Sequence, residues 1–130
     1  MTDGVLLLAR VLMSVIFILS GLLKLSTAAA TQALLTKMGL PLPVLAWLIA
    51  VVVELGGGLA LLFGLATRQV AIVLALWCVA TALVAHSNLA DRQMQVHFMK
   101  NLVMAGGFLY VAVLGAGSFS LDGWRHRRND

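Results

Sequence analysis

Charged residues are scarce in this sequence: Asp, Glu, Lys and Arg together make up 11% of its 130 residues. Soluble globular domains carry roughly 25% of them, so this scarcity argues against a soluble domain. Apolar residues make up 62% of the chain, and the mean hydropathy is +1.02. Residues 1–130 are therefore predicted to form a single integral membrane domain.

Cysteine is also scarce, since Cys78 is the only one. A single cysteine excludes an intramolecular disulfide, a CxxC redox pair and a thiolate-based metal site. The histidines, at 86, 97 and 126, lack the spacing of haem or zinc ligands, and no iron–sulfur motif occurs. We predict no metal site, so any redox chemistry would need a borrowed cofactor.

Proline occurs only at Pro41 and Pro43. These prolines end any helix in the first loop, and Pro43 is well placed to begin the next helix. Four apolar runs reach or approach the roughly 20 residues that cross a bilayer as a helix. We expect spans over about 5–25, 44–64, 69–86 and 96–115. The fold is thus predicted to be an all-α, polytopic membrane four-helix bundle. The segment AATQALLTKM in the first loop is predicted to form a short interfacial helix.

Basic residues give a net charge of +4, but they are scattered, which argues against nucleic-acid binding. Only the end of the chain, WRHRRND, is a basic cluster. Such clusters mark the cytoplasmic side of a membrane and contact anionic lipid. We therefore expect residues 116–130 to be a basic cytoplasmic tail, and both termini of this multi-pass protein to be cytoplasmic.

Glu54 lies near the middle of the second predicted span. A charge at that depth costs at least about 2.5 kcal/mol and must face a partner inside the bundle. In the first span, polar and small residues recur every three or four positions and share one helix face: they are Arg10, Ser14, Phe17, Gly21 and Lys24. We predict an intramembrane ion pair between Arg10 and Glu54, in a role that is either structural or functional.

Small residues predict where helices approach closely. The second span carries the ladder Gly56, Ala60 and Gly64, and the third carries Ala71, Ala75, Cys78 and Ala82.

The predicted topology gathers a second polar group at the outer end of the bundle. Lys24, His86, Lys100 and Asn101 are predicted to line a vestibule, with His97 as an alternative at its rim. Their ammonium, imidazole and amide donors would suit a carbonyl or anionic group of a membrane-dissolved ligand, and a quinone head group fits chemically. Glu54 and His86 are the candidate catalytic residues, because intramembrane ionisable groups often relay protons.

Four segments, LLLARVLMSVIFILSGLLKL, MGLPLP, VVELGGGLALLFGLATR and NLVMAGGFLYVAVLGAGSFSLD, resemble in order the DoxX family of small bacterial inner-membrane proteins. The positions that match the family pattern are Arg10, Ser20, Gly21, Lys24, Gly39, Pro41, Glu54, Gly57, Arg68, His86, Asn101 and Gly107. That family is associated with thiosulfate:quinone oxidoreductase subunits and other membrane redox complexes. The resemblance implies an inner-membrane location and a partner in a redox system, whereas the lone cysteine disfavours a self-contained thiol mechanism.

Three functional hypotheses follow. The leading one is a subunit of, or accessory to, a membrane redox system that contacts quinone or another lipid-soluble substrate; it would be an oxidoreductase subunit with no redox centre of its own. The alternative is a non-catalytic scaffold or assembly subunit of a membrane complex. The third is a small-solute or proton carrier that works as a homo-oligomer, because four short helices enclose little space. In each case the lipid bilayer is one partner.

Overall fold

The structure is a computed structural model that describes residues 2–129. Every regular element in that range is a helix, which confirms the predicted all-α class. The elements are α1 (Thr2–Ser26), α2 (Ala28–Lys37), α3 (Pro43–Val51), the π-helix η1 (Val52–Gly56), α4 (Gly57–Phe63), α5 (Thr67–Ala85), α6 (Arg92–Leu114) and α7 (Leu121–Asn129).

Four helical stretches are long and apolar enough to cross a membrane, as predicted: Thr2–Ser26, Pro43–Phe63, Thr67–Ala85 and Arg92–Leu114. The second stretch joins α3, η1 and α4 without a break. The fourth begins four residues before the apolar run, because Asp91 caps it. The Asp91 carboxylate accepts hydrogen bonds from the amides of Gln93 and Met94, which satisfies free donors of the first turn.

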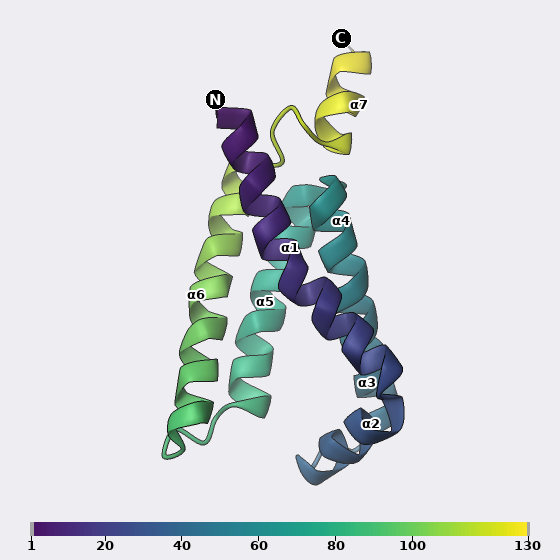
Figure 1. Cartoon of the computed structure of the whole chain (residues 1–130), viewed down its shortest axis with the longest axis vertical. Coiled ribbons are helices and arrows are strands. Elements are labelled where there is room, and N and C mark those ends of the chain that lie inside the picture. The colour runs from purple at the N-terminus through teal and green to yellow at the C-terminus, as the bar shows by residue number, and fades with distance from the viewer. Residues whose placement is uncertain (1, 130) are drawn as a thin grey trace.

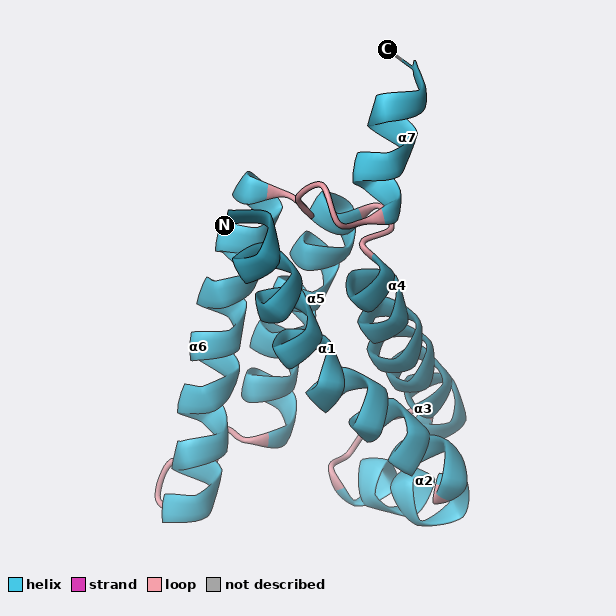
Figure 2. Ribbon diagram, turned by 45° about the horizontal axis from the view of Figure 1, so that its top comes forward, coloured by secondary structure: helices cyan, strands magenta, loops and turns pink. Residues whose placement is uncertain are grey.

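The helices form two groups that meet at one end and diverge toward the other (Figure 1). Helices α5 and α6 pack against each other as an antiparallel pair, while α1 packs along η1 and α4. Both termini lie where the groups meet, which we call the termini end. Helix α2, the short helix predicted in the first loop, lies at the opposite end, where the groups are splayed apart (Figure 2).

The predicted buried faces of two spans are confirmed. In α1, Arg10, Ser14, Phe17 and Gly21 are buried. In α5, all four small residues of the predicted face are buried, together with Leu74. The core forms where these faces meet α4 and α6, and the rings of Phe17 and Phe108 pack edge-on there with centroids 5.4 Å apart.

The close approach between the first and second spans includes Gly64 of the predicted Gly56–Ala60–Gly64 ladder, which lies against Arg10, but it does not include Gly56. Gly56 faces open space, whereas a Cβ on Gly21 would lie 2.7 Å from the Leu55 amide nitrogen, and one on Gly58 would lie 3.0 Å from Ile18. The reason is η1, whose wider turn adds a residue and rotates the helix face that follows. Such turns are rare in proteins and recur at functional sites, and Glu54 lies at the centre of this one.

The chain after α6 folds back onto the termini end. Asp122, at the start of α7, accepts hydrogen bonds from the amides of Ala66 (2.9 Å) and Thr67 (2.8 Å) and so caps α5. The Ser118 amide donates to Asp3 in α1 over 3.0 Å. The predicted basic tail is therefore partly helical, and hydrogen bonds tie it to the start of α5 and to α1.

Candidate functional site: a polar cluster in an apolar intramembrane cavity

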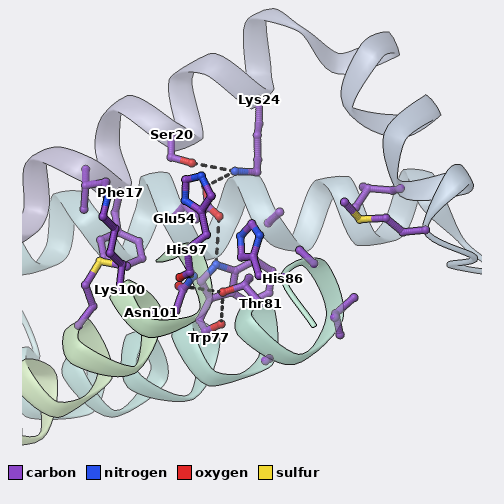
Figure 3. A pocket seen from close by; sticks show the side chains of 18 of the residues that line it. Phe17, Ser20, Lys24, Glu54, Trp77, Thr81, His86, His97, Lys100 and Asn101 are labelled. Atoms are coloured by element: carbon purple, nitrogen blue, oxygen red, sulfur yellow. Dashed lines mark hydrogen bonds and ion pairs between the residues drawn. The ribbon is translucent and has the colours of Figure 1, made fainter. Parts of the chain in front are cut away.

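A cavity of about 1250 Å³ lies between the two helix groups. Its walls come from α1, α2, α3, η1, α5 and α6, and it extends from Phe17 and Met104 in mid-bundle to Met38 and His86 at the splayed end. We call that end the cavity end. Most of the lining is apolar. Its polar side chains are Ser20, Lys24, Glu54, Trp77, Thr81, His86, His97, Lys100 and Asn101, with Thr31 and Gln95 nearer the end (Figure 3).

Glu54 is the centre of this cluster. The Lys24 ammonium donates to Glu54 Oε2 over 2.8 Å and to the Ser20 hydroxyl over 2.7 Å. The Trp77 indole N–H donates to Glu54 Oε1 over 3.0 Å. Both carboxylate oxygens are therefore paired, although the Glu54 side chain is only 7% exposed. An intramembrane carboxylate survives through such pairing.

The predicted Arg10–Glu54 ion pair is wrong, because Glu54 pairs with Lys24 instead. Gly21 packs against Leu55, so the α1 residues at the depth of Glu54 are those around Gly21 and Lys24. Arg10 lies eleven residues before Gly21, which is roughly 16 Å along a helix. An arginine side chain is too short for that gap.

Arg10 is instead a cap for the end of α4. Its guanidinium donates to the carbonyl oxygens of Leu61 (3.3 Å) and Leu62 (3.1 Å), and also to that of Phe119. The last carbonyls of a helix have no partner within the helix and carry its negative dipole end. A buried guanidinium donates hydrogen bonds to these carbonyls, and its positive charge also stabilises the negative end of the dipole.

The two histidines of the cavity lie against each other. The rings of His86, which follows α5, and His97, in α6, stack with centroids 5.1 Å apart. His86 Nδ1 is buried and has no hydrogen-bond partner among residues 2–129. Burial and the neighbouring His97 lower the pKa of His86 below its ordinary value of 6.5, so His86 is neutral at pH 7.

Asn101 is held in place from two sides. Its amide nitrogen donates to the His97 carbonyl over 3.0 Å, and its amide oxygen accepts from the Thr81 hydroxyl over 3.2 Å. This contact joins α5 to α6 beside the histidine pair.

The predicted vestibule residues do line one cavity: Lys24, His86, Lys100 and Asn101 are all there, as is His97. Sequence reasoning did not place Thr81 or Trp77 in the cavity, and it gave Ser20 only as a position that matches the family pattern. Helical spacing held the signal for two of them, because Ser20 lies one turn before Lys24, and Thr81 lies one turn after Trp77.

Several donors remain available to a ligand. An ammonium group has three protons, and Lys24 directs two of them to Ser20 and Glu54. The His86 ring nitrogen is unpaired, and Lys100 makes no ion pair among the described residues. Together with apolar walls, these donors suit an amphiphilic molecule whose polar head accepts hydrogen bonds.

This fold and this cavity define a small helical membrane protein with four potential spans and a polar cluster inside the bundle. The chain belongs to the DoxX family, whose model matches residues 5–87, and this confirms the resemblance seen in the sequence.

Two relatives cover nearly the whole chain. Inner membrane protein YqjF of Escherichia coli (strain K12) is 42% identical over 119 residues, covering 89% of this chain and 88% of the relative. Inner membrane protein YphA of the same organism is 34% identical over 122 residues, covering 90% and 87%. No solved structure matches the chain.

Proposed function

We propose that this protein binds a lipid-soluble molecule of the quinone class in its intramembrane cavity, and that it does so as a subunit of, or accessory to, a membrane redox system. The observation that carries the proposal is that Lys24 keeps a third proton beyond its bonds to Ser20 and Glu54, and that His86 Nδ1 has no partner among the described residues, on otherwise apolar walls. The names of both relatives support a location in the bacterial inner membrane.

The donors of the cavity fit a quinone head group, which is flat and bears two carbonyl acceptors. The third proton of Lys24 and a ring N–H of His86 would each be donated to a carbonyl oxygen. The apolar residues of α2 and α3 that line the same cavity, including Leu34 and Ile49, would contact the isoprenoid tail. When bound, the quinone would supply the capacity to accept electrons, which the side chains of this chain lack.

Glu54 and His86 are the proposed proton-handling residues. Glu54 lies within the cluster as a carboxylate held by Lys24 and Trp77, and His86 is neutral at pH 7 and can accept a proton. The source of electrons would be a partner protein in the same membrane, in keeping with an accessory role.

Native mass spectrometry of the detergent-extracted protein tests the proposal, with ubiquinone and a saturated hydrocarbon of similar length as probes. We expect retained ubiquinone and no retained hydrocarbon. Replacement of His86 by Ala removes one hydrogen bond of about 1 kcal/mol and should weaken ubiquinone binding about fivefold. The matched control is His126→Ala in α7, outside the cavity, which should leave binding unchanged.

A charge-neutral double variant separates binding from folding. Lys24→Met combined with Glu54→Gln removes both charges together, so no unpaired charge remains. We expect this variant to stay folded and to lose ubiquinone binding at least about tenfold, because hydrogen bonds from charged groups contribute about 1.5–3 kcal/mol. Full binding by the folded double variant would contradict the proposal.

One observation favours the scaffold alternative. Both oxygens of Glu54 and both ends of the Asn101 amide are already paired within the chain, as expected if these residues only fix how the helices pack. In that case the protein would co-purify with a membrane enzyme whose activity survives Glu54→Gln and His86→Ala.

A further inference from the structure

The termini end carries a second hollow, of about 780 Å³, that the proposed quinone site does not use. It lies between the start of α5, the segment after α6 and the helix α7. Its charged and titratable lining consists of Arg68, Asp122, Arg125, His126 and Arg127, and we call it the basic hollow.

The basic hollow has more positive than negative charge. The Asp122 carboxylate is taken up by the amides of Ala66 and Thr67, and the charge of Arg125 acts on it as well. Asp3 accepts a hydrogen bond from the amide of Ser118, which lines the hollow, and the charge of Arg127 acts on it. The ion pair found within residues 2–129 is Lys24–Glu54, so none of the three arginines of the hollow is held by a carboxylate there.

One of these arginines, Arg68, lies beside the end of α6. Gly115, which ends α6, has a φ of +78°, and a Cβ at this position would lie 3.4 Å from Arg68 Nε. A side chain there would be strained by the backbone, and its Cβ would be in ordinary van der Waals contact with the guanidinium. Arg68 therefore lies against the end of the neighbouring span.

The hollow lies where α5 begins and α6 ends. Leu114, which lines it, is exposed, and so are Phe119 and Trp124, each next in the chain to a residue that lines it. Tryptophan and basic residues together are typical of the level of lipid head groups, and basic pockets between spans bind anionic lipids. Guanidinium groups pair with phosphate through two parallel hydrogen bonds.

We propose that the basic hollow binds the phosphate head group of an anionic phospholipid, whose acyl chains lie along the lipid-facing sides of α5 and α6. Arg68 and Arg127 contact the phosphate, and Arg125 balances Asp122. This site is independent of the cavity in which quinone binding is proposed.

The test uses the full chain in nanodiscs made from equal parts of phosphatidylglycerol and phosphatidylcholine, followed by native mass spectrometry. The wild type should retain phosphatidylglycerol in preference to phosphatidylcholine. Each basic residue near a membrane contributes about 1 kcal/mol, or about fivefold, to anionic lipid binding. Arg68→Gln with Arg127→Gln should therefore reduce the preference about 25-fold. The side chains of Arg68 and Arg127 are both exposed, so this double variant is expected to fold.

The matched control removes two positive charges at the cavity end, by Lys37→Gln and Arg92→Gln, and should keep the preference. An equal loss in both double variants would mean a nonspecific charge effect and would overturn the proposal. Excess inorganic phosphate should leave the lipid bound, because the acyl chains add apolar contacts. Displacement by phosphate alone would identify a free-anion site instead and would also overturn it.

Discussion

Two cationic side chains of α1, Arg10 and Lys24, share one buried helix face but are neutralised in different ways at opposite ends of the bundle. Arg10 is 1% exposed and is held by carbonyl oxygens from α4 and from the segment before α7. Lys24 has a side chain that is 28% exposed, and it faces a carboxylate on the wall of a large cavity.

The difference lies in what each partner can do. Backbone carbonyls cannot change protonation state, so Arg10 joins three segments in a fixed arrangement. A carboxylate such as Glu54 can gain or lose a proton. The Lys24 ammonium can also donate to another acceptor in the cavity in place of Glu54. At the termini end, Arg10 therefore fixes α1 to α4 and to the segment before α7, while at the cavity end His86 Nδ1 has no partner among the described residues.

The largest effect on stability is expected from Arg10→Met. The carbonyls of Leu62 and Phe119 would lose their donor, and each unsatisfied buried group costs about 1–3 kcal/mol. We expect a loss of about 2–6 kcal/mol in the free energy of unfolding, measured by reversible unfolding in mixed micelles.

Arg92→Met is the matched control for that variant. Arg92 is exposed at the start of α6, so its replacement should change the free energy of unfolding by no more than about 0.5 kcal/mol. If the two variants were equally destabilised, the contacts of Arg10 with α4 and with the segment before α7 would not be what stabilises the fold.

A smaller loss of stability is expected from Glu54→Gln. The amide oxygen of glutamine can still accept from Trp77, and the partly exposed Lys24 is not trapped in the core. We expect a cost of about 1–3 kcal/mol in unfolding free energy. Adding Lys24→Met should recover part of it, because the unpaired charge is then removed. A purely additive loss in this double variant would mean that the two side chains do not interact.

A loss of about 1 kcal/mol is expected from Asp122→Asn, which weakens the cap of α5. Burial by itself would raise the pKa of Asp122, but the hydrogen bonds from Thr67 and Ala66 and the charge of Arg125 lower it below 3.8. The carboxylate is thus favoured in the folded state. Its contribution is present above pH 3.8 and is lost as the pH falls through the lowered pKa. Unfolding of wild type and variant should therefore differ at pH 7 and converge in acid.

Much of the fold was predictable, because membrane spans depend on apolar length and on the spacing of buried residues. The face that carries Ser14 and Phe17 follows from helical period alone, and so does the small-residue face of α5. The start at Pro43 follows from the preference of proline for the first turn of a helix. What could not be read was η1, since no residue type marks a π-turn. The added residue moved the close contact from Gly56 to Gly58.

The sequence was enough to predict several of the polar residues that line the cavity, but not which of them pair with each other. Polar residues at similar depth in the spans had to meet, and Lys24, His86 and Asn101 do. To predict the partner of Glu54, one must know which turn of the first span lies at the depth of Glu54. The sequence does not fix the relative depth of two spans to within a few turns. The role of Arg10 depended on where α4 ends and on how the segment after α6 folds back, and both are tertiary features.

The smallest effect, and the one that most directly tests the cavity end, concerns the stacked histidines. Burial and the proximity of His97 lower the pKa of His86 below 6.5, so protonation favours the unfolded state. Stability should be unaffected by His86 above pH 6.5, and it should decline as the pH falls from 6.5 through the lowered pKa. Thermal unfolding at pH 7.5 and at pH 5.5 should therefore differ more for the wild type than for His86→Gln, whose side chain does not titrate. A His126→Gln variant, with its change in the exposed α7, should keep the pH response of the wild type. If His86→Gln kept that response as well, the ring would already be solvated and would not contribute a buried neutral donor to the cavity.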